Sequence, residues 1–253
     1  MSASRAVEIA VQDLAGVRTA LAEGADRIEL CVGLGLGGLT PSIGLIECAV
    51  DAAHEAGAEG FVHVLIRPRG GDFVYDRAEL VTATRDIHRA VAAGVDGVVI
   101  GALTKDGAVD LSATEDLVAA SQDADVTFHR AFDVVPDRAK ALDQLADLGV
   151  LRVLTSGGAA TCADGIAELT ELVEQSDDLV EIMAGGAMEI SDIPAMIQAG
   201  VDAVHLSARR SVTGGVAGPG GGAPTYDRTD AELVRAAVAA RHEAAAAKHG
   251  AEQ

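Results

Sequence analysis

The stretch Ala93-Gly-Val-Asp-Gly-Val98 ends a helical pattern with a glycine and starts an apolar strand almost at once. The same arrangement returns as Glu23-Gly-Ala-Asp-Arg-Ile28, Leu148-Gly-Val-Leu-Arg-Val153 and Ala199-Gly-Val-Asp-Ala-Val204. Glycine ends helices because it adopts the left-handed conformation without a steric penalty. Each copy therefore predicts a helix-to-strand joint, and the repetition indicates one unit used many times.

Eight short apolar runs predict buried strands, and Ala-rich stretches with helical periodicity lie between them. The strands are expected at Val7–Val11, Arg27–Cys31, Phe61–Arg67, Gly97–Leu103, Val126–Phe132, Arg152–Ser156, Val180–Ala184 and Ala203–Ser207. Helices are expected at Asp13–Glu23, Ser42–Ala56, Arg77–Ala93, Asp137–Leu148 and Asp192–Ala199, among others. Strict alternation favours a parallel sheet covered by helices. We predict an α/β fold, a TIM (β/α)8 barrel, with an open doubly wound sheet as the alternative.

No boundary divides the 253 residues, so residues 1–253 are expected to form a single domain. This length suits one barrel, which typically needs about 250 residues. After the last strand, residues 211–225 are rich in glycine and predict a long loop. Thr229-Asp-Ala-Glu232 has the pattern of a capping box and predicts a final helix over about 229–248.

Charge and cysteine content narrow the classes of partner. The formal net charge of −20 disfavours nucleic acid and membrane surfaces. Three cysteines without regular spacing predict reduced thiols, which are typical of the cytoplasm. The N-terminal residues lack a signal-peptide pattern and no apolar run approaches the length of a membrane span. A cytoplasmic location is therefore expected.

Charged side chains gather where the predicted strands end, which is where TIM barrels carry their sites. Candidate acid and base groups are Glu8, Glu29, His129 and Asp133. Candidate ligand-binding residues are Arg67, Arg69, Asp72, Arg130, Ser156, Gly157, Gly185 and Ser207. Arginine binds carboxylates and phosphates with paired hydrogen bonds, so Arg67 and Arg69 predict a small anionic ligand. The alternative is a plug of salt bridges that closes the barrel end without chemistry.

Two glycine-rich turns, residues 155–158 and 184–187, follow the sixth and seventh strands. Their backbone N–H groups are candidates for holding a phosphate, and tight turns with positive φ are the alternative. The segment Gly33-Leu-Gly-Leu-Gly-Gly38 matches a dinucleotide fingerprint. However, its helix begins too late and the next strand ends in Arg67 instead of an acid, so no nucleotide cofactor is expected.

Cys31 ends the second strand two residues after Glu29, so the two side chains share a strand face. It is a candidate thiolate or metal ligand, and ordinary burial is the alternative.

Five segments together resemble the CutC family: Ala25-Asp-Arg-Ile-Glu-Leu-Cys31, Gly37-Gly-Leu-Thr-Pro-Ser42, Ile66-Arg-Pro-Arg-Gly-Gly-Asp-Phe73, Val126-Thr-Phe-His-Arg-Ala-Phe-Asp133 and Arg152-Val-Leu-Thr-Ser-Gly157. The resemblance runs from about residue 7 to residue 209. It implies a TIM barrel, a cytoplasmic location, homo-oligomers and a role in copper homeostasis, with Cu(I) bound through cysteines in some members. One such cysteine matches Cys31. The position of the other holds Ala10, and a single thiolate cannot form a two-thiolate copper site.

Two functions therefore remain open from the sequence. One is a copper-binding protein of copper homeostasis that uses Cys31 and has a polar, anion-accepting site at the barrel mouth. The other is an enzyme, such as a lyase, isomerase or hydrolase, that acts on a small anionic or phosphorylated substrate.

Overall fold

The structure, a computed structural model, describes residues 5–215 and 225–251. Eight parallel strands form a closed barrel in chain order, and β8 pairs with β1. The strands are β1 (Ala6–Val11), β2 (Arg27–Leu30), β3 (Val62–Leu65), β4 (Gly97–Ile100), β5 (Asp125–Phe128), β6 (Arg152–Thr155), β7 (Glu181–Gly185) and β8 (Ala203–Leu206). The predicted TIM barrel is confirmed, because an open sheet would leave β1 and β8 unpaired.

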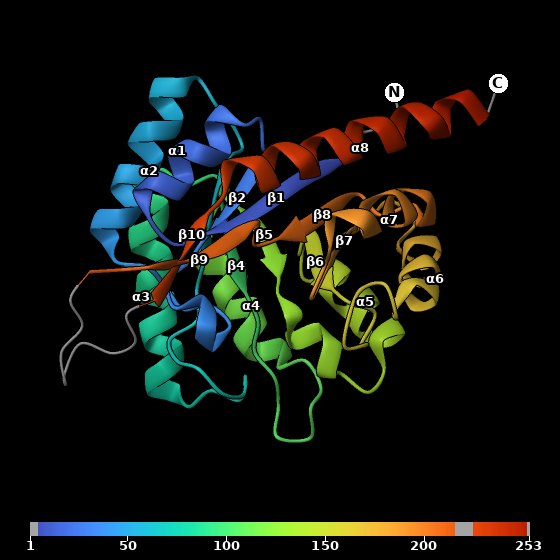
Figure 1. Ribbon diagram of the computed structural model, residues 1–253. Helices are drawn as coiled ribbons and strands as arrows, with labels where there is room; N and C mark the ends of the chain where they lie inside the picture. The colour runs from blue at the N-terminus through green and yellow to red at the C-terminus, as the bar shows by residue number, and fades with distance from the viewer. Residues whose placement is uncertain (1–4, 216–224, 252–253) are drawn as a thin grey trace.

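Helices surround the strands (Figure 1). They are α1 (Leu14–Ala22), α2 (Ile43–Ala56), α3 (Arg77–Ala92), α4 (Leu111–Ala120), α5 (Arg138–Asp147), α6 (Ile166–Ser176), α7 (Ile193–Ala199) and α8 (Ala231–Ala251). Three short 3-10 helices lie after β2, β5 and β7, namely η1 (Leu34–Leu36), η2 (Arg130–Val134) and η3 (Ile190–Asp192). None of the helices in the described ranges combines the length and the apolar character needed to span a bilayer.

The region after β8 differs from the prediction of a long loop. Strands β9 (Arg209–Thr213) and β10 (Thr225–Thr229) form an antiparallel pair, and residues 216–224 of the predicted loop lie outside the described residues. The final helix also begins later than expected. The cap is Asp230, whose carboxylate accepts the Leu233 N–H at 3.0 Å, and Thr229 belongs to β10 instead. Helix α8 then packs between α1 and α7 beside β1 (Figure 1).

The repeated joints have the predicted conformation. Gly24, Gly94, Gly149 and Gly200 all have positive φ, between 79° and 100°. The aspartate two residues after three of these glycines has a role that the sequence did not reveal. Asp96 accepts backbone N–H groups of Phe61 and Val62, at 3.0 and 2.9 Å, and so fastens the start of the preceding strand β3.

Asp26 and Asp202 make the equivalent bond to the N–H groups of Val7 and Ile182, each at 2.8 Å. Each of these three joints therefore secures the strand of the unit before it. The fourth joint has Leu151 at this position.

Strand residues alternate between two very different environments. The outward side chains of β1 and β2, such as Val7, Ile9 and Ile28, are fully buried under the helices and form the main apolar core. The inward positions of the same strands carry charged groups, because side chains alternate with a period of two. The barrel interior therefore contains charged groups beside small apolar clusters, and the pocket at the carboxyl ends of its strands is the candidate site.

Candidate active site

A pocket of about 350 Å³ lies at the carboxyl ends of the barrel strands. Its wall includes residues from the strand ends and from the loops that follow them. Among the described residues, three arginines, Arg67, Arg130 and Arg209, line it, and Glu29 is the single carboxylate on its wall. Burial next to low-dielectric walls strengthens the field of these charges.

A network of charged side chains connects Glu8, in the barrel interior, with Glu29 on the pocket wall. The buried carboxylate of Glu8 accepts Arg27 Nε at 2.5 Å on one oxygen and lies 2.7 Å from His205 Nδ1 on the other. The far ring nitrogen, His205 Nε2, lies 3.9 Å from the Glu29 carboxylate. His205 and Glu29 both line the pocket. The register explains the arrangement, because Glu8 is paired with Arg27 on β2 and with His205 on β8.

Within this network the pKa values of the side chains shift in different directions. Burial raises the pKa of Glu29 to about 7, against the opposing charge of His205. For Glu8, burial acts in the same direction, but Arg27 and the hydrogen bond to His205 outweigh it and hold the pKa well below its usual value. The bond to Glu8 likewise outweighs burial at His205 and raises the pKa of that imidazole. Glu29 is therefore present in both protonation states near neutral pH.

Arg67 follows β3, the neighbour of β2 in the barrel, and lines the same pocket. Its guanidinium donates to the carbonyl oxygens of Leu36 at 2.9 Å, Gly38 at 3.0 Å and Gly71 at 2.8 Å, and so joins two loops. Within the described ranges no carboxylate lies within ion-pairing distance of Arg67, and its Nε has no hydrogen-bond partner. The charge of this buried side chain is thus uncompensated by an acid.

His129, at the end of β5, also lines the pocket. Its Nδ1 accepts the Ala131 N–H at 3.2 Å, while its buried Nε2 has no partner among the described residues. The ring stacks on Phe73 with a centroid separation of 4.8 Å and lies so close to Gly101 that a Cβ atom there would overlap it. Burial, together with the charge of Arg67, lowers the pKa of His129 to about 3.

The glycine-rich turn after β6 is held by Asp133. Its carboxylate accepts Thr155 Oγ1 at 2.6 Å, the Ser156 N–H at 2.9 Å and the Gly158 N–H at 3.2 Å. The Gly157 N–H donates to Thr155 Oγ1 at 2.9 Å. These N–H groups serve the turn, which corrects the expectation that they are free to hold a phosphate. Tight turns with positive φ are the correct interpretation here.

Arg130 connects this turn to the pocket. It donates to Asp133 at 2.7 Å and to Ser156 Oγ at 3.1 Å, and its side chain is 42% exposed. Gly186, in the turn after β7, allows this close approach, because a Cβ atom there would lie 2.8 Å from the Arg130 guanidinium carbon. Asp133 therefore positions Arg130, whereas Arg130 itself lines the pocket.

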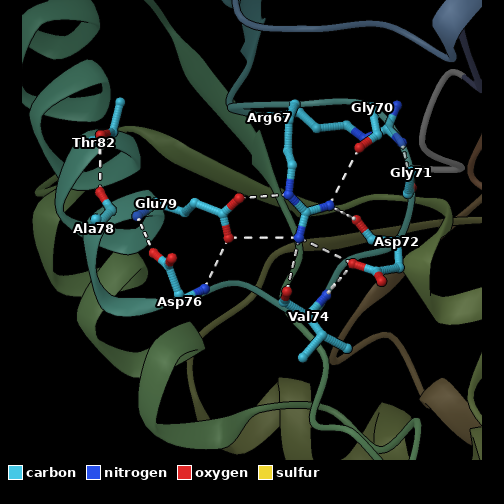
Figure 2. Close-up of polar contacts among 10 residues, drawn as sticks. Arg67, Gly70, Gly71, Asp72, Val74, Asp76, Ala78, Glu79 and Thr82 are labelled. Carbon is cyan, nitrogen blue, oxygen red and sulfur yellow. Dashed lines mark hydrogen bonds and ion pairs between the residues drawn. The ribbon is translucent and has the colours of Figure 1, made fainter.

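Arg69 and Asp72 lie outside the pocket wall, although they follow the same strand as Arg67. Arg69 pairs with Glu79 on α3 at 2.5 Å and with Asp72 at 3.0 Å. Figure 2 shows this network, in which Glu79 also forms a capping box with Asp76 at the start of α3. The pair predicted as an anion clamp is thus divided, since Arg67 lines the pocket and Arg69 ties a loop to a helix.

Of the other predicted residues, Ser207 lines the pocket, whereas Gly185 comes directly before Gly186 of the wall and is not itself among the lining residues. A Cβ atom at Gly185 would lie 2.6 Å from Leu154 and 3.1 Å from His205, so the glycine provides space between neighbouring strands.

Cys31 is fully buried in a small apolar cluster with Leu65 and Val99. Burial, reinforced by the charge of Glu29, raises the pKa of its thiol above the usual range. Copper needs a thiolate, and Ala10 offers no second one. Across residues 5–215 and 225–251, no three His, Cys, Asp or Glu side chains form a group that could hold a metal ion. These residues do not fit the copper site that the resemblance implies.

Five residues were not among the predicted site residues, namely Arg27, His63, Arg152, His205 and Arg209, and of these His205 and Arg209 line the pocket. A signal was present for the first four. Each lies an even number of residues before a predicted site residue of the same predicted strand (Glu29, Arg67, Ser156 or Ser207), and a strand with period two places such residues on one face. Arg209 had no comparable signal, because it lies between the last predicted strand and the loop predicted at 211–225.

The fold and the pocket define a TIM barrel with a charged site at the carboxyl ends of its strands. The CutC family model matches residues 5–210. A family protein CutC from Glaesserella parasuis is 44% identical over 204 residues, 80% of this chain and 82% of that protein. Another, from Rhizobium meliloti, is 41% identical over 246 residues, 96% of this chain and 98% of that protein. The chain belongs to the CutC family.

Comparison with solved structures agrees with this family assignment and with the barrel fold. A Streptococcus agalactiae protein, provisionally called copper homeostasis protein CutC, is 37% identical and superimposes with a TM-score of 0.76 over 80% of this chain and 98% of its own. Thiamine phosphate pyrophosphorylase from Pyrococcus furiosus is 14% identical with a TM-score of 0.61, over 95% of this chain and 98% of its own. That second likeness concerns the fold alone.

Proposed function

We propose that this protein is an enzyme that moves a proton to or from a small anionic substrate at the carboxyl ends of the barrel strands. The observation that carries the proposal is Arg67, a buried cation on the pocket wall without a carboxylate partner in the described ranges. A plug of salt bridges would pair Arg67 with Glu8 or Glu29, whereas Glu8 pairs with Arg27. An uncompensated buried charge is costly, and an anionic ligand would offset that cost.

The distribution of charge supports an anion. The chain carries a net charge of −20, yet the described residues that line this pocket include three arginines and one glutamate. Arg130 and Arg209 are only partly buried, at 42% and 34% exposure of the side chain, and each also pairs with an aspartate, Asp133 at 2.7 Å and Asp227 at 3.1 Å. Such a site raises the local concentration of anions in an otherwise acidic protein.

Glu29 and His205 supply the acid–base chemistry. General bases work best when their pKa lies near the working pH, and Glu29 meets this condition at about 7. Glu8 fixes the ring of His205 through Nδ1, so that Nε2 is directed to Glu29. A protonated His205 would stabilise the Glu29 carboxylate, and Glu29 would exchange the proton with the substrate.

Anion binding can be tested by thermal shift with orthophosphate and with acetate. We expect at least one of them to raise the melting temperature of the wild-type protein. Arg130→Gln should reduce the shift, because Arg130 lines the pocket. The matched control is Arg138→Gln, since Arg138 pairs with Glu168 away from the pocket wall and should leave the shift unchanged. Absence of any shift in the wild type would contradict an anion site.

Proton transfer can be tested without knowing the product. Small carboxylates and phosphorylated compounds are incubated with the protein in deuterium oxide, and loss of C–H signal is followed by proton NMR. Glu29→Gln should lower the exchange rate by roughly 100- to 10,000-fold, as expected for removal of a general base. Glu115→Gln, on the exposed face of α4, serves as control. Exchange that persists in Glu29→Gln would show that another group is the base.

Membership of the CutC family favours a second candidate, a role in copper homeostasis. Copper binding would have to depend on Cys31, because Ala10 occupies the other position that the resemblance assigns to a cysteine. Because Cys31 is buried, we expect its binding of copper to be weak. We place this candidate second.

The remaining expectations are part of the same proposal. The acidic chain and its free cysteines, Cys31, Cys48 and Cys162, support a cytoplasmic protein that binds neither nucleic acid nor membranes. A homo-oligomer rests on the family resemblance. Light scattering coupled to size-exclusion chromatography measures the mass of the assembly directly, and a monomer mass would contradict it.

A further inference from the structure

Two buried N–H donors belong to residues that line the pocket and have no hydrogen-bond acceptor among the described residues. They are Arg67 Nε and His129 Nε2, which belong to residues that are 6% and 5% exposed. Both side chains contact Phe73, since the Arg67 guanidinium lies 5.1 Å and the His129 ring 4.8 Å from its centroid. A buried donor without an acceptor destabilises the fold, so such groups are rare in native proteins unless a ligand satisfies them.

The two donors are held rigidly. Three carbonyl oxygens fix the guanidinium of Arg67, and the Ala131 N–H fixes Nδ1 of His129 as an acceptor. Because Nδ1 accepts a hydrogen bond, the ring is neutral and its proton lies on Nε2. Gly101 lets the ring lie against the backbone of β4, where a side chain would exclude it. Donors fixed in advance are the arrangement that stabilises developing negative charge on oxygen.

We propose that Arg67 Nε–H and His129 Nε2–H bind the carbonyl oxygen of the substrate, which is a small anion with a carbonyl group next to the C–H bond that breaks. This inference rests on the proposed function. Glu29 removes the proton of that C–H bond, and the electron pair moves onto the carbonyl oxygen to form an enolate. The two N–H groups bind the enolate oxygen, while the more exposed arginines bind the anionic group. Return of the proton from Glu29 to carbon completes the reaction without an oxidant or reductant.

Oxalate is a suitable probe, because its two adjacent carboxylates resemble the enolate of a 2-oxo acid. Its dissociation constant is measured by calorimetry beside those of acetate and orthophosphate. We expect oxalate to bind the wild type at least about tenfold more tightly than acetate. His129→Leu should weaken oxalate roughly 10- to 100-fold, as expected for loss of one buried hydrogen bond to a charged group. Orthophosphate affinity should change less than about twofold, since the arginines remain.

Two further variants separate a binding role from a structural one. His129→Gln retains an N–H donor in the side chain and should restore most of the oxalate affinity. His63 offers a matched control, because it is buried at 1% exposure and lies against Gly97, but is not among the residues that line the pocket. His63→Leu should leave oxalate affinity unchanged. Should His129→Leu fail to fold, His129→Met also fills the space without an N–H group.

The outcomes distinguish this inference from the function on which it rests. Wild-type protein that binds phosphate, but whose oxalate affinity is unaffected by loss of the His129 N–H, would overturn the oxyanion role and leave the anion pocket standing. Wild-type protein that binds none of the three anions would overturn the proposed function as well. An equal loss of oxalate affinity in His63→Leu would mean that His129 acts only through the fold.

Discussion

Two glycines, Gly97 at the start of β4 and Gly101 directly after it, leave space for two histidine rings inside the barrel. A Cβ atom at Gly97 would overlap the ring of His63, and a Cβ atom at Gly101 would overlap the ring of His129. The two histidine rings therefore fit because Gly97 and Gly101 have no side chains that would occupy the same space. The orientation of His129, on which the pocket depends, is set as much by this absence as by its own hydrogen bond to Ala131.

We predict that Gly101→Ala displaces the His129 ring and costs about 1–3 kcal/mol of unfolding free energy, the usual range for overpacking. It should also weaken oxalate binding. Urea denaturation and calorimetry measure the two effects. Gly44→Ala is the control, because no atom lies within 4 Å of a Cβ there and the position is helical, so stability should be unchanged or higher. Wild-type stability and binding in Gly101→Ala would show that the ring has room to move.

We also predict that the protein binds Cu(I) weakly and that this binding depends on the single thiol of Cys31. Cys31→Ala should abolish it, and Ala10→Cys should strengthen it, because two thiolates on neighbouring strands can bind Cu(I) together. Titration against a competing Cu(I) chelator gives the affinities. Tight binding that survives Cys31→Ala would reverse the ranking of the two proposed functions.

The helix-to-strand joint is the element that recurs most clearly. Its glycine ends the helix, and its aspartate bonds the N–H groups at the start of the preceding strand. Carboxylates that accept backbone N–H groups form stronger bonds than neutral acceptors do. Asp96 accepts three such groups, from Gly60, Phe61 and Val62.

We therefore predict that Asp96→Ala lowers the unfolding free energy by about 2–4 kcal/mol, since it leaves N–H groups at the base of β3 without their acceptor. Asp123→Ala, at an exposed position before β5, should change it by less than about 0.5 kcal/mol. Urea denaturation compares both variants with the wild type. Equal stabilities would show that water replaces the carboxylate.

Sequence reasoning located these elements well for a physical reason. Helix caps such as Asp13, Ser42 and Asp137 and the joint glycines act locally, so their signals lie within a few residues. Side-chain pairing is different, because it depends on the register between strands and on loops distant in sequence. The pairing of Glu8 with Arg27, and the carbonyl groups that bind Arg67, could not be predicted for that reason.

Over the whole molecule, the polar barrel interior makes stability depend on pH in two opposite ways. Burial, with a contribution from neighbouring arginines, lowers the pKa of His63 to about 3. Between pH 6.5 and 3 the unfolded chain binds a proton that this folded histidine does not, so acid weakens the fold. Glu29, with its pKa raised to about 7, acts in the opposite direction. Its contribution to stability is present below pH 4.5 and is lost as the pH rises towards 7.

We predict that His63→Leu loses less stability on acidification than the wild type does. Between pH 6.5 and pH 5 the difference should be about 2 kcal/mol, which corresponds to one buried histidine that no longer resists protonation. Urea denaturation at the two pH values measures it, and only the difference between the two proteins matters, since Glu29 contributes equally to both. If His63→Leu and the wild type lost the same unfolding free energy between pH 6.5 and pH 5, His63 would be accessible to protons in the folded state.

The aspartate bonds also define where one unit of the barrel ends. A strand and its helix are not complete by themselves, because the carboxylate that secures β1 comes from Asp26, after α1. The natural modules for fragment complementation therefore end after the aspartate, not at the end of the helix. Fragments divided after Asp96 keep β3 and the carboxylate that bonds its first N–H groups together, whereas a division at Ala93 places that carboxylate in the other fragment. The same boundary is the one that duplication of an ancestral unit would have to respect.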